Sequence, residues 1–260
     1  MWALAWAAIA GWTAWRCRNT RQLPWAVLLV AIGARVLFLG LPPTLSDDVF
    51  RYLWEGKVQL AGFNPFVYAP SDPALAGLRD AIHAQVAHPN VPTLYPPLAQ
   101  LLFRLSALCY TPLFFQATGL LADLGIVFLL VQRAHSQSRS LWPAVFWALH
   151  PLPILESSAS GHIETLAIFM TVAAVLFLER KQHTRGALMA AAGGLVKLLP
   201  FLLVAQALRG GPPRRRTHTV LACTALITMA TLPFLGAGRS LFTGFETYAV
   251  HWSHNASVFG

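Results

Sequence analysis

Long apolar stretches dominate this chain and constrain its fold more than any other feature. They lie near residues 2–15, 23–42, 112–131, 141–157, 163–178, 187–208 and 220–236. Several approach the roughly 20 residues that a membrane-spanning helix needs. Only 11% of the residues are charged, whereas an average soluble domain carries roughly 25%. The pattern predicts an all-α polytopic membrane protein in which residues 1–260 form a single membrane domain.

The basic residues identify the cytoplasmic side. Most of them fall in four short connections between apolar stretches, at 16–21, 133–139, 180–185 and 209–216. The positive-inside rule assigns such connections to the cytoplasm. The net charge of +9 does not indicate a nucleic-acid partner, because these loops are separate and have no interleaved aromatic residues.

Two basic loops on the same side of the membrane must be separated by an even number of crossings. This requirement and the direction of each helix predict three further features. Residues 43–95 contain no candidate span and form a long outside loop, which we expect to carry surface helices. Basic loops flank residues 186–208 on both sides, which predicts a re-entrant hairpin that breaks near Gly194–Pro200. Such a break requires a polar interior. Residues 237–260 begin another outside loop, where the chain reads as truncated.

Two adjacent acids, Asp47 and Asp48, follow the first outward helix directly. A carboxylate held at a helix end can deprotonate a hydroxyl and activate it for attack on an electrophilic carbon. The alternative is that these acids, together with Ser46, only cap a surface helix. Both interpretations hold if one acid is the general base and the other caps the helix.

The second outside loop contains Glu156, His162 and Glu164. Carboxylates and imidazole are ligands for divalent metals, and a bound metal could in turn hold a phosphate group. The alternative is an ordinary hydrophilic turn between two helices. We therefore expect a substrate site that includes these residues, with Mg or Mn as a candidate cofactor.

Lys197 lies in an apolar segment, at the expected hairpin break. An ammonium in the bilayer costs at least about 2.5 kcal/mol unless it is paired or hydrated, so a functional role is the first hypothesis. Here it would neutralise a phosphate. The alternative is a side chain that reaches the membrane surface from a short helix.

Short motifs in a characteristic order run from about residue 46 to residue 259. They are "SDDVFRYLWEGKVQLAGFNPF", "YPPLAQLLF", "HPLPILESSASGHIE", "GGLVKLLP" and "WSHNASVF". In this order the chain resembles the GT-C superfamily of polytopic glycosyltransferases, in particular the bacterial polyprenyl-phosphate-mannose-dependent mannosyltransferases. The resemblance implies a GT-C-like helical bundle.

The resemblance also implies a function. The protein would sit in the cytoplasmic membrane of a bacterium and act as a hexosyltransferase on its outer side. It would transfer a sugar, with mannose expected, from a polyprenyl-phosphate donor to a hydroxyl of a glycan or lipid acceptor, with inversion. Asp48 would be the general base, with Asp47 as the alternative. The expected substrate-binding residues are Arg51, Tyr52, Glu156, His162, Glu164, Lys197, His254 and Asn255.

Two other classes of function remain open on the sequence. A transporter also uses broken helices and a lysine at membrane depth, but inverted repeats, which would favour it, are not visible in the sequence. The other alternative is a non-catalytic protein that binds lipid-linked saccharides.

Overall fold

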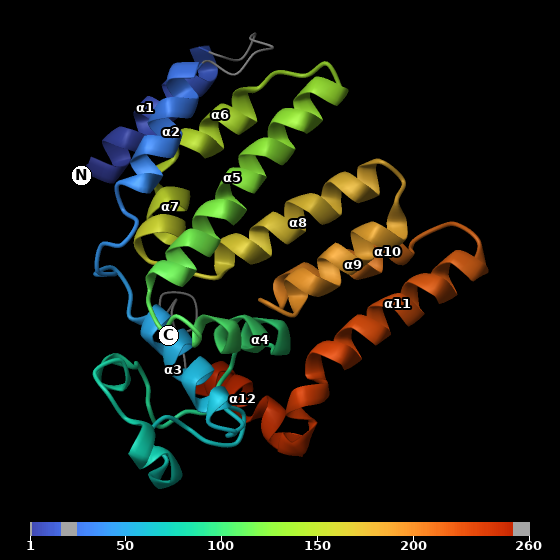
Figure 1. The fold of residues 1–260 in the computed structure, drawn as a ribbon. Coiled ribbons are helices and arrows are strands. Elements are labelled where there is room, and N and C mark those ends of the chain that lie inside the picture. Colours follow the sequence, from blue (N-terminus) through green and yellow to red (C-terminus); the bar gives the residue numbers. More distant parts are fainter. Residues whose placement is uncertain (1, 17–24, 252–260) are drawn as a thin grey trace.

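The computed structural model describes residues 2–16 and 25–251. These residues form helices joined by loops and turns, and no β-strand occurs among them. Helices satisfy their own backbone hydrogen bonds, as a bilayer requires. The architecture is that of an all-α membrane protein, as the sequence predicts (Figure 1).

Two segments of the described chain are long and apolar enough to cross a bilayer. One is α5 (Leu113–Ser136), and the other runs from Pro213 to Thr247. The second comprises α11 (Pro213–Thr231), η5 (Leu232–Phe242) and the start of α12 (Thr243–His251). The other apolar helices of the bundle are shorter: α1 (Trp2–Arg16), α2 (Trp25–Val36), α6 (Trp142–Leu149) and α8 (Glu164–Glu179).

The expected helix at 141–157 is interrupted. Helix α6 ends at Leu149, α7 spans Pro151–Ile154, and a π-helical turn, η3, spans Leu155–Ala159. Proline has no backbone N–H and clashes with the preceding turn, so Pro151 starts a new helix and does not continue α6. The interruption brings the polar end of this segment beside α5.

A buried ion pair joins the helices of the bundle. The Nε atom of Arg35 on α2 lies 2.6 Å from the Oδ2 atom of Asp123 on α5, and both side chains are fully buried. Arg35 Nη1 also donates to the carbonyl oxygens of Ala31 and Ala148, while Trp147 Nε1 donates to Asp123 Oδ1. These bonds hold α2, α5 and α6 together.

Residues 183–208 reverse direction, as expected for the hairpin. Helix α9 (His183–Gly194) leads into a break, and η4 (Leu199–Phe201) and α10 (Leu202–Leu208) return beside it (Figure 1). At the break, the carbonyl oxygen of Leu195 accepts from the N–H groups of Leu98 and Ala99, at the start of α4 (Pro97–Ser106). The start of the break is therefore covered by α4, whereas Leu198 and Leu199 are exposed. The hairpin's position in the membrane stays a prediction.

The 43–95 segment is mostly folded, and its main element is α3 (Asp48–Leu60), followed by the short helices η1 (Pro73–Leu78) and η2 (His83–Gln85). Helix α3 packs against α4 so closely that a Cβ at Gly56 would lie 2.0 Å from the carbonyl oxygen of Phe103. The aromatic rings of Tyr52, Tyr95 and Phe103 fill the core between them. This core anchors the first residue of α3, Asp48.

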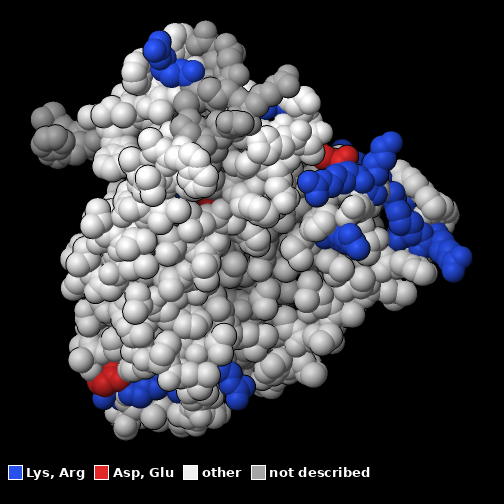
Figure 2. All heavy atoms as spheres, turned by 45° about the horizontal axis from the view of Figure 1, so that its top comes forward, with Lys and Arg blue, Asp and Glu red and all other residues white. Residues whose placement is uncertain are grey.

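Charge is unevenly distributed over the surface. Figure 2 shows Lys and Arg at the top, the upper right and the lower end of one face, with a broad and almost uncharged region between them. Such a region is typical of a surface that contacts lipid.

Candidate active site

A cavity of about 560 Å³ opens beside the first turn of α3. Asp48 on α3, Glu164 on α8 and Lys197 at the hairpin break all line it. The same wall includes Asp47, Arg51 and Tyr95. Residues from segments far apart in the sequence therefore meet at one cavity.

Ser46 makes the side-chain hydrogen bond at the start of α3, and neither Asp47 nor Asp48 is needed for it. Ser46 Oγ accepts a hydrogen bond from the backbone N–H of Asp48 at 3.2 Å. Asp47 stands at the N-cap position, but its side chain makes no capping hydrogen bond. Asp47 is exposed, whereas Asp48 is partly buried. Of the two acids, Asp48 is held more closely by the protein.

The surroundings of Asp48 favour its protonated form. Burial by the cavity wall is the largest influence and raises the pKa of the carboxyl above its ordinary value. Glu164 and Asp47 raise the pKa further, while His162 and Lys197 lower it. A raised pKa strengthens a carboxylate as a proton acceptor, which suits a general base.

Glu156 and His162 pair with each other. The His162 Nδ1 atom contacts Glu156 Oε2, and His162 Nε2 lies 3.8 Å from Asp48 Oδ2. Glu156 belongs to the π-helical turn η3, and such turns are frequent at functional sites. Gly161 follows with a φ of 70°, a left-handed conformation that glycine adopts without strain. This turn brings His162 back onto Glu156.

Lys197 is paired as well. Its Nζ atom lies 2.6 Å from Glu164 Oε1 and 5.2 Å from the centre of the Tyr95 ring. The side chains of Lys197 and Glu164 are 33% and 39% exposed. The ammonium is therefore compensated but remains accessible from the cavity.

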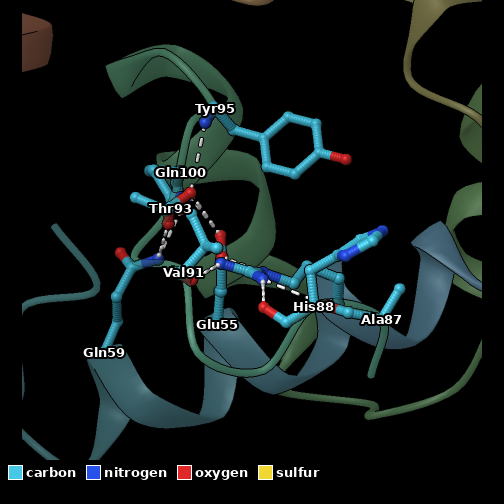
Figure 3. A network of polar contacts seen from close by, with 9 residues as sticks. Glu55, Gln59, Ala87, His88, Val91, Thr93, Tyr95 and Gln100 are labelled. Atoms are coloured by element: carbon cyan, nitrogen blue, oxygen red, sulfur yellow. Dashed lines mark hydrogen bonds and ion pairs between the residues drawn. The ribbon is translucent and has the colours of Figure 1, made fainter. Parts of the chain in front are cut away.

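Arg51 supports the cavity wall. Its Nη atoms donate to the carbonyl oxygens of Ala87, His88 and Val91, and its Nε donates to Glu55 at 2.6 Å. Figure 3 shows Glu55 at the centre of this network, where Thr93 and Gln100 also donate to it. Ala87, His88 and Val91 line the cavity. Arg51 thus holds the segment that forms one wall.

The remaining candidates lie elsewhere. Tyr52 is fully buried between aromatic rings and does not line the cavity. Glu156 does not line it either and reaches Asp48 only through His162. His254 and Asn255 lie outside the described residues. Within the described ranges, no group of three or more His, Cys, Asp and Glu side chains could hold a metal ion. The metal expected from Glu156, His162 and Glu164 stays a prediction.

Several residues of the site were missed by the sequence interpretation. Glu55, Thr93 and Gln100 form the buried network behind Arg51, and Tyr95 covers Lys197. Glu55 follows Arg51 by four residues, the spacing of neighbours on one helical face, and this signal could have identified the pair. Thr93 and Gln100 have no comparable local signal.

The structure combines an apolar helical bundle with a cavity lined by acids and a lysine. The sequence model of glycosyltransferase family 87 matches residues 93–258, and the chain belongs to that family. The protein is thus a membrane glycosyltransferase. Glu156, His162, Glu164 and Lys197 lie within the matched residues, whereas Asp47 and Asp48 precede them. Neither the curated proteins nor the solved structures include a significant match.

Proposed function

We propose that this glycosyltransferase moves a sugar, mannose being the expected one, from a polyprenyl-phosphate donor to an acceptor hydroxyl of a glycan or lipid. The reaction takes place on the outer side of a bacterial cytoplasmic membrane. The observation that carries the proposal is the meeting of Asp48, Glu164 and Lys197 at one cavity. Its volume of about 560 Å³ lies within the roughly 300–1,000 Å³ of small-molecule sites.

The chemistry is a single displacement. The acceptor oxygen bonds to the anomeric carbon while the bond from that carbon to the phosphate oxygen breaks. The acceptor proton passes to Asp48, and the electron pair of the broken bond leaves on the lipid phosphate. One displacement at one carbon inverts its configuration.

Lys197 supports the departure of the phosphate. An ammonium beside a leaving phosphate stabilises the negative charge that develops there. Glu164 holds Lys197 before the donor binds, because their atoms lie 2.6 Å apart. When the donor enters, the phosphate competes with Glu164 for the ammonium.

The donor class is tested with the purified protein in lipid vesicles. Radiolabelled polyprenyl-phosphate mannose and the corresponding nucleotide sugar are supplied separately, each with an extract of membrane glycolipids as acceptor. We expect transfer from the polyprenyl donor alone, and a product whose new linkage, determined by NMR, has inverted configuration. Transfer from the nucleotide sugar alone would contradict the proposed donor, and retention would contradict the single displacement.

A further inference from the structure

The two ring nitrogens of His162 have different surroundings: one contacts Glu156, and the other lies near Asp48, the proposed base. Nδ1 contacts Glu156, whereas Nε2 is buried and makes no hydrogen bond with any described residue. Nε2 lies 3.8 Å from the carboxylate oxygen Oδ2 of Asp48. A buried polar atom without a hydrogen-bond partner is uncommon and needs an explanation.

The local fold holds the imidazole in this orientation. The backbone N–H of His162 donates to the carbonyl oxygen of Glu156 at 2.9 Å. The same turn is attached to α5, because Gln116 Nε2 donates to the carbonyl oxygen of Ala159 and Ser157 Oγ to Asp123. The turn that carries the imidazole is therefore held in place by α5.

We propose that Glu156, His162 and Asp48 form a proton relay, a role that rests on the proposed function. Asp48 receives the acceptor proton as the new sugar bond forms. The proton then moves from the Asp48 carboxyl to His162 Nε2, and the resulting imidazolium is stabilised through Nδ1–H by the Glu156 carboxylate. Asp48 is thereby returned to its ionised form, and the proton leaves to water past Glu156, which is 39% exposed.

The distance between His162 and Asp48 is compatible with this step. Catalytic hydrogen bonds are often long without substrate and shorten in the reactive complex, and one water can also bridge them. The Asp48 side chain is 41% exposed, so the surrounding protein leaves it room to rotate. The other charged groups that act on Asp48 are Asp47, Glu164 and Lys197.

Substitution of His162 separates a relay from a binding role. In His162→Gln, an amide replaces the imidazole at similar length and can still donate to Glu156, but it cannot accept a proton. We expect kcat to fall by at least about tenfold and by at most the roughly 10²–10⁴-fold that a general acid–base group contributes, while KM for the polyprenyl-phosphate sugar stays unchanged. A rise in KM with kcat unchanged would assign His162 to substrate binding and overturn the relay.

Chemical rescue gives an independent readout. In His162→Ala, added imidazole should restore transfer, and the rescue should grow with pH as the free base replaces imidazolium. Lys197→Ala, measured in parallel, should show no rescue. If His162→Ala does not fold, the kcat and KM of His162→Gln decide the question. A folded His162→Ala that loses transfer and is not rescued would show a purely structural role.

Failure of the relay differs from failure of the proposed function. If Asp48→Asn loses transfer while His162→Gln retains it, the relay is wrong and Asp48 remains the base. If Asp48→Asn retains transfer, the proposed base itself is wrong, whatever the His162 variants do.

Discussion

Among the described residues, one group of charged side chains inside the bundle differs from another group around the cavity. The bundle group is Arg35 and Asp123, both fully buried and joined at 2.6 Å. The cavity group comprises Asp48, Glu164 and Lys197, which line the cavity, and Glu156 and His162, which contact each other beside Asp48. Except for His162, which is 15% exposed, the side chains of the cavity group are 33–41% exposed. The first group is enclosed by protein, whereas the second faces open space.

The two groups also differ in how their polar atoms are used. Within the bundle, each carboxylate oxygen of Asp123 accepts hydrogen bonds, and Arg35 lacks a described partner only at Nη2. In the cavity group, His162 Nε2 and Glu164 Oε2 make no hydrogen bond with the described residues. Both groups therefore contain buried polar atoms without a described partner, but only the cavity group includes residues that line a cavity.

The largest effect on stability is expected at the buried pair. Asp123→Ala leaves Arg35 as an uncompensated buried charge, which typically costs about 3–5 kcal/mol. We expect a corresponding loss in the free energy of unfolding, measured by denaturation in detergent.

A double variant is the control for this prediction. Arg35→Met combined with Asp123→Leu removes both charges, and replacing a whole buried pair by apolar residues is often neutral. It should recover most of the lost stability. A stability of Asp123→Ala within about 1 kcal/mol of the unmodified protein would contradict a structural role for the pair.

A smaller effect, on activity, is expected at Lys197. A hydrogen bond to a charged group contributes about 1.5–3 kcal/mol, so Lys197→Gln should lower kcat/KM by about 10- to 150-fold. Lys197→Arg, which keeps the charge, should retain more activity. A kcat/KM of Lys197→Gln equal to that of the unmodified protein would remove the lysine from the site.

A third effect is expected in the pH profile. A general base acts when ionised, so transfer is lost as the pH falls through the pKa of Asp48. Glu164 raises that pKa and Lys197 lowers it. Glu164→Gln should therefore shift the acid limb of kcat/KM to lower pH, and Lys197→Gln should shift it to higher pH. Shifts in the same direction would show that these residues do not share a site with Asp48.

The smallest effect is expected at a surface pair. Arg133 and Glu179 lie 2.7 Å apart, with side chains 29% and 32% exposed. Accessible pairs contribute about 0–1 kcal/mol. Arg133→Ala should change the Tm only slightly and leave transfer unchanged, and a loss comparable to that of Asp123→Ala would erase the distinction between buried and exposed pairs.

The sequence predicted the elements better than their contacts. Apolar length and loop charge predicted the helical fold, and parity predicted the reversal near Gly194–Pro200. Charge in an apolar context pointed to Lys197. These signals lie in short stretches of sequence or follow from counting the membrane crossings between basic loops, so they can be recognised without a structure.

Other features depend on contacts that no local pattern encodes. Tyr52 was expected to bind substrate, yet it packs in the core between α3 and α4. The contact between Glu156 and His162 depends on the turn at Gly161, which the sequence interpretation did not anticipate. The break before Pro151 did have a signal, since "HPLP" disfavours a continuous helix.

The central claim is that Asp48 serves catalysis and not stability, and one variant tests both parts. Burial raises the pKa of Asp48, so its ionised form is disfavoured in the folded protein, and this cost is present at a pH above that pKa. For Asp48→Asn at neutral pH, we predict a loss of transfer of about 10²–10⁴-fold with a Tm equal to or above that of the unmodified protein, while Asp47→Asn retains transfer. A Tm that falls, or transfer that persists above about a tenth of the original rate, would contradict the account.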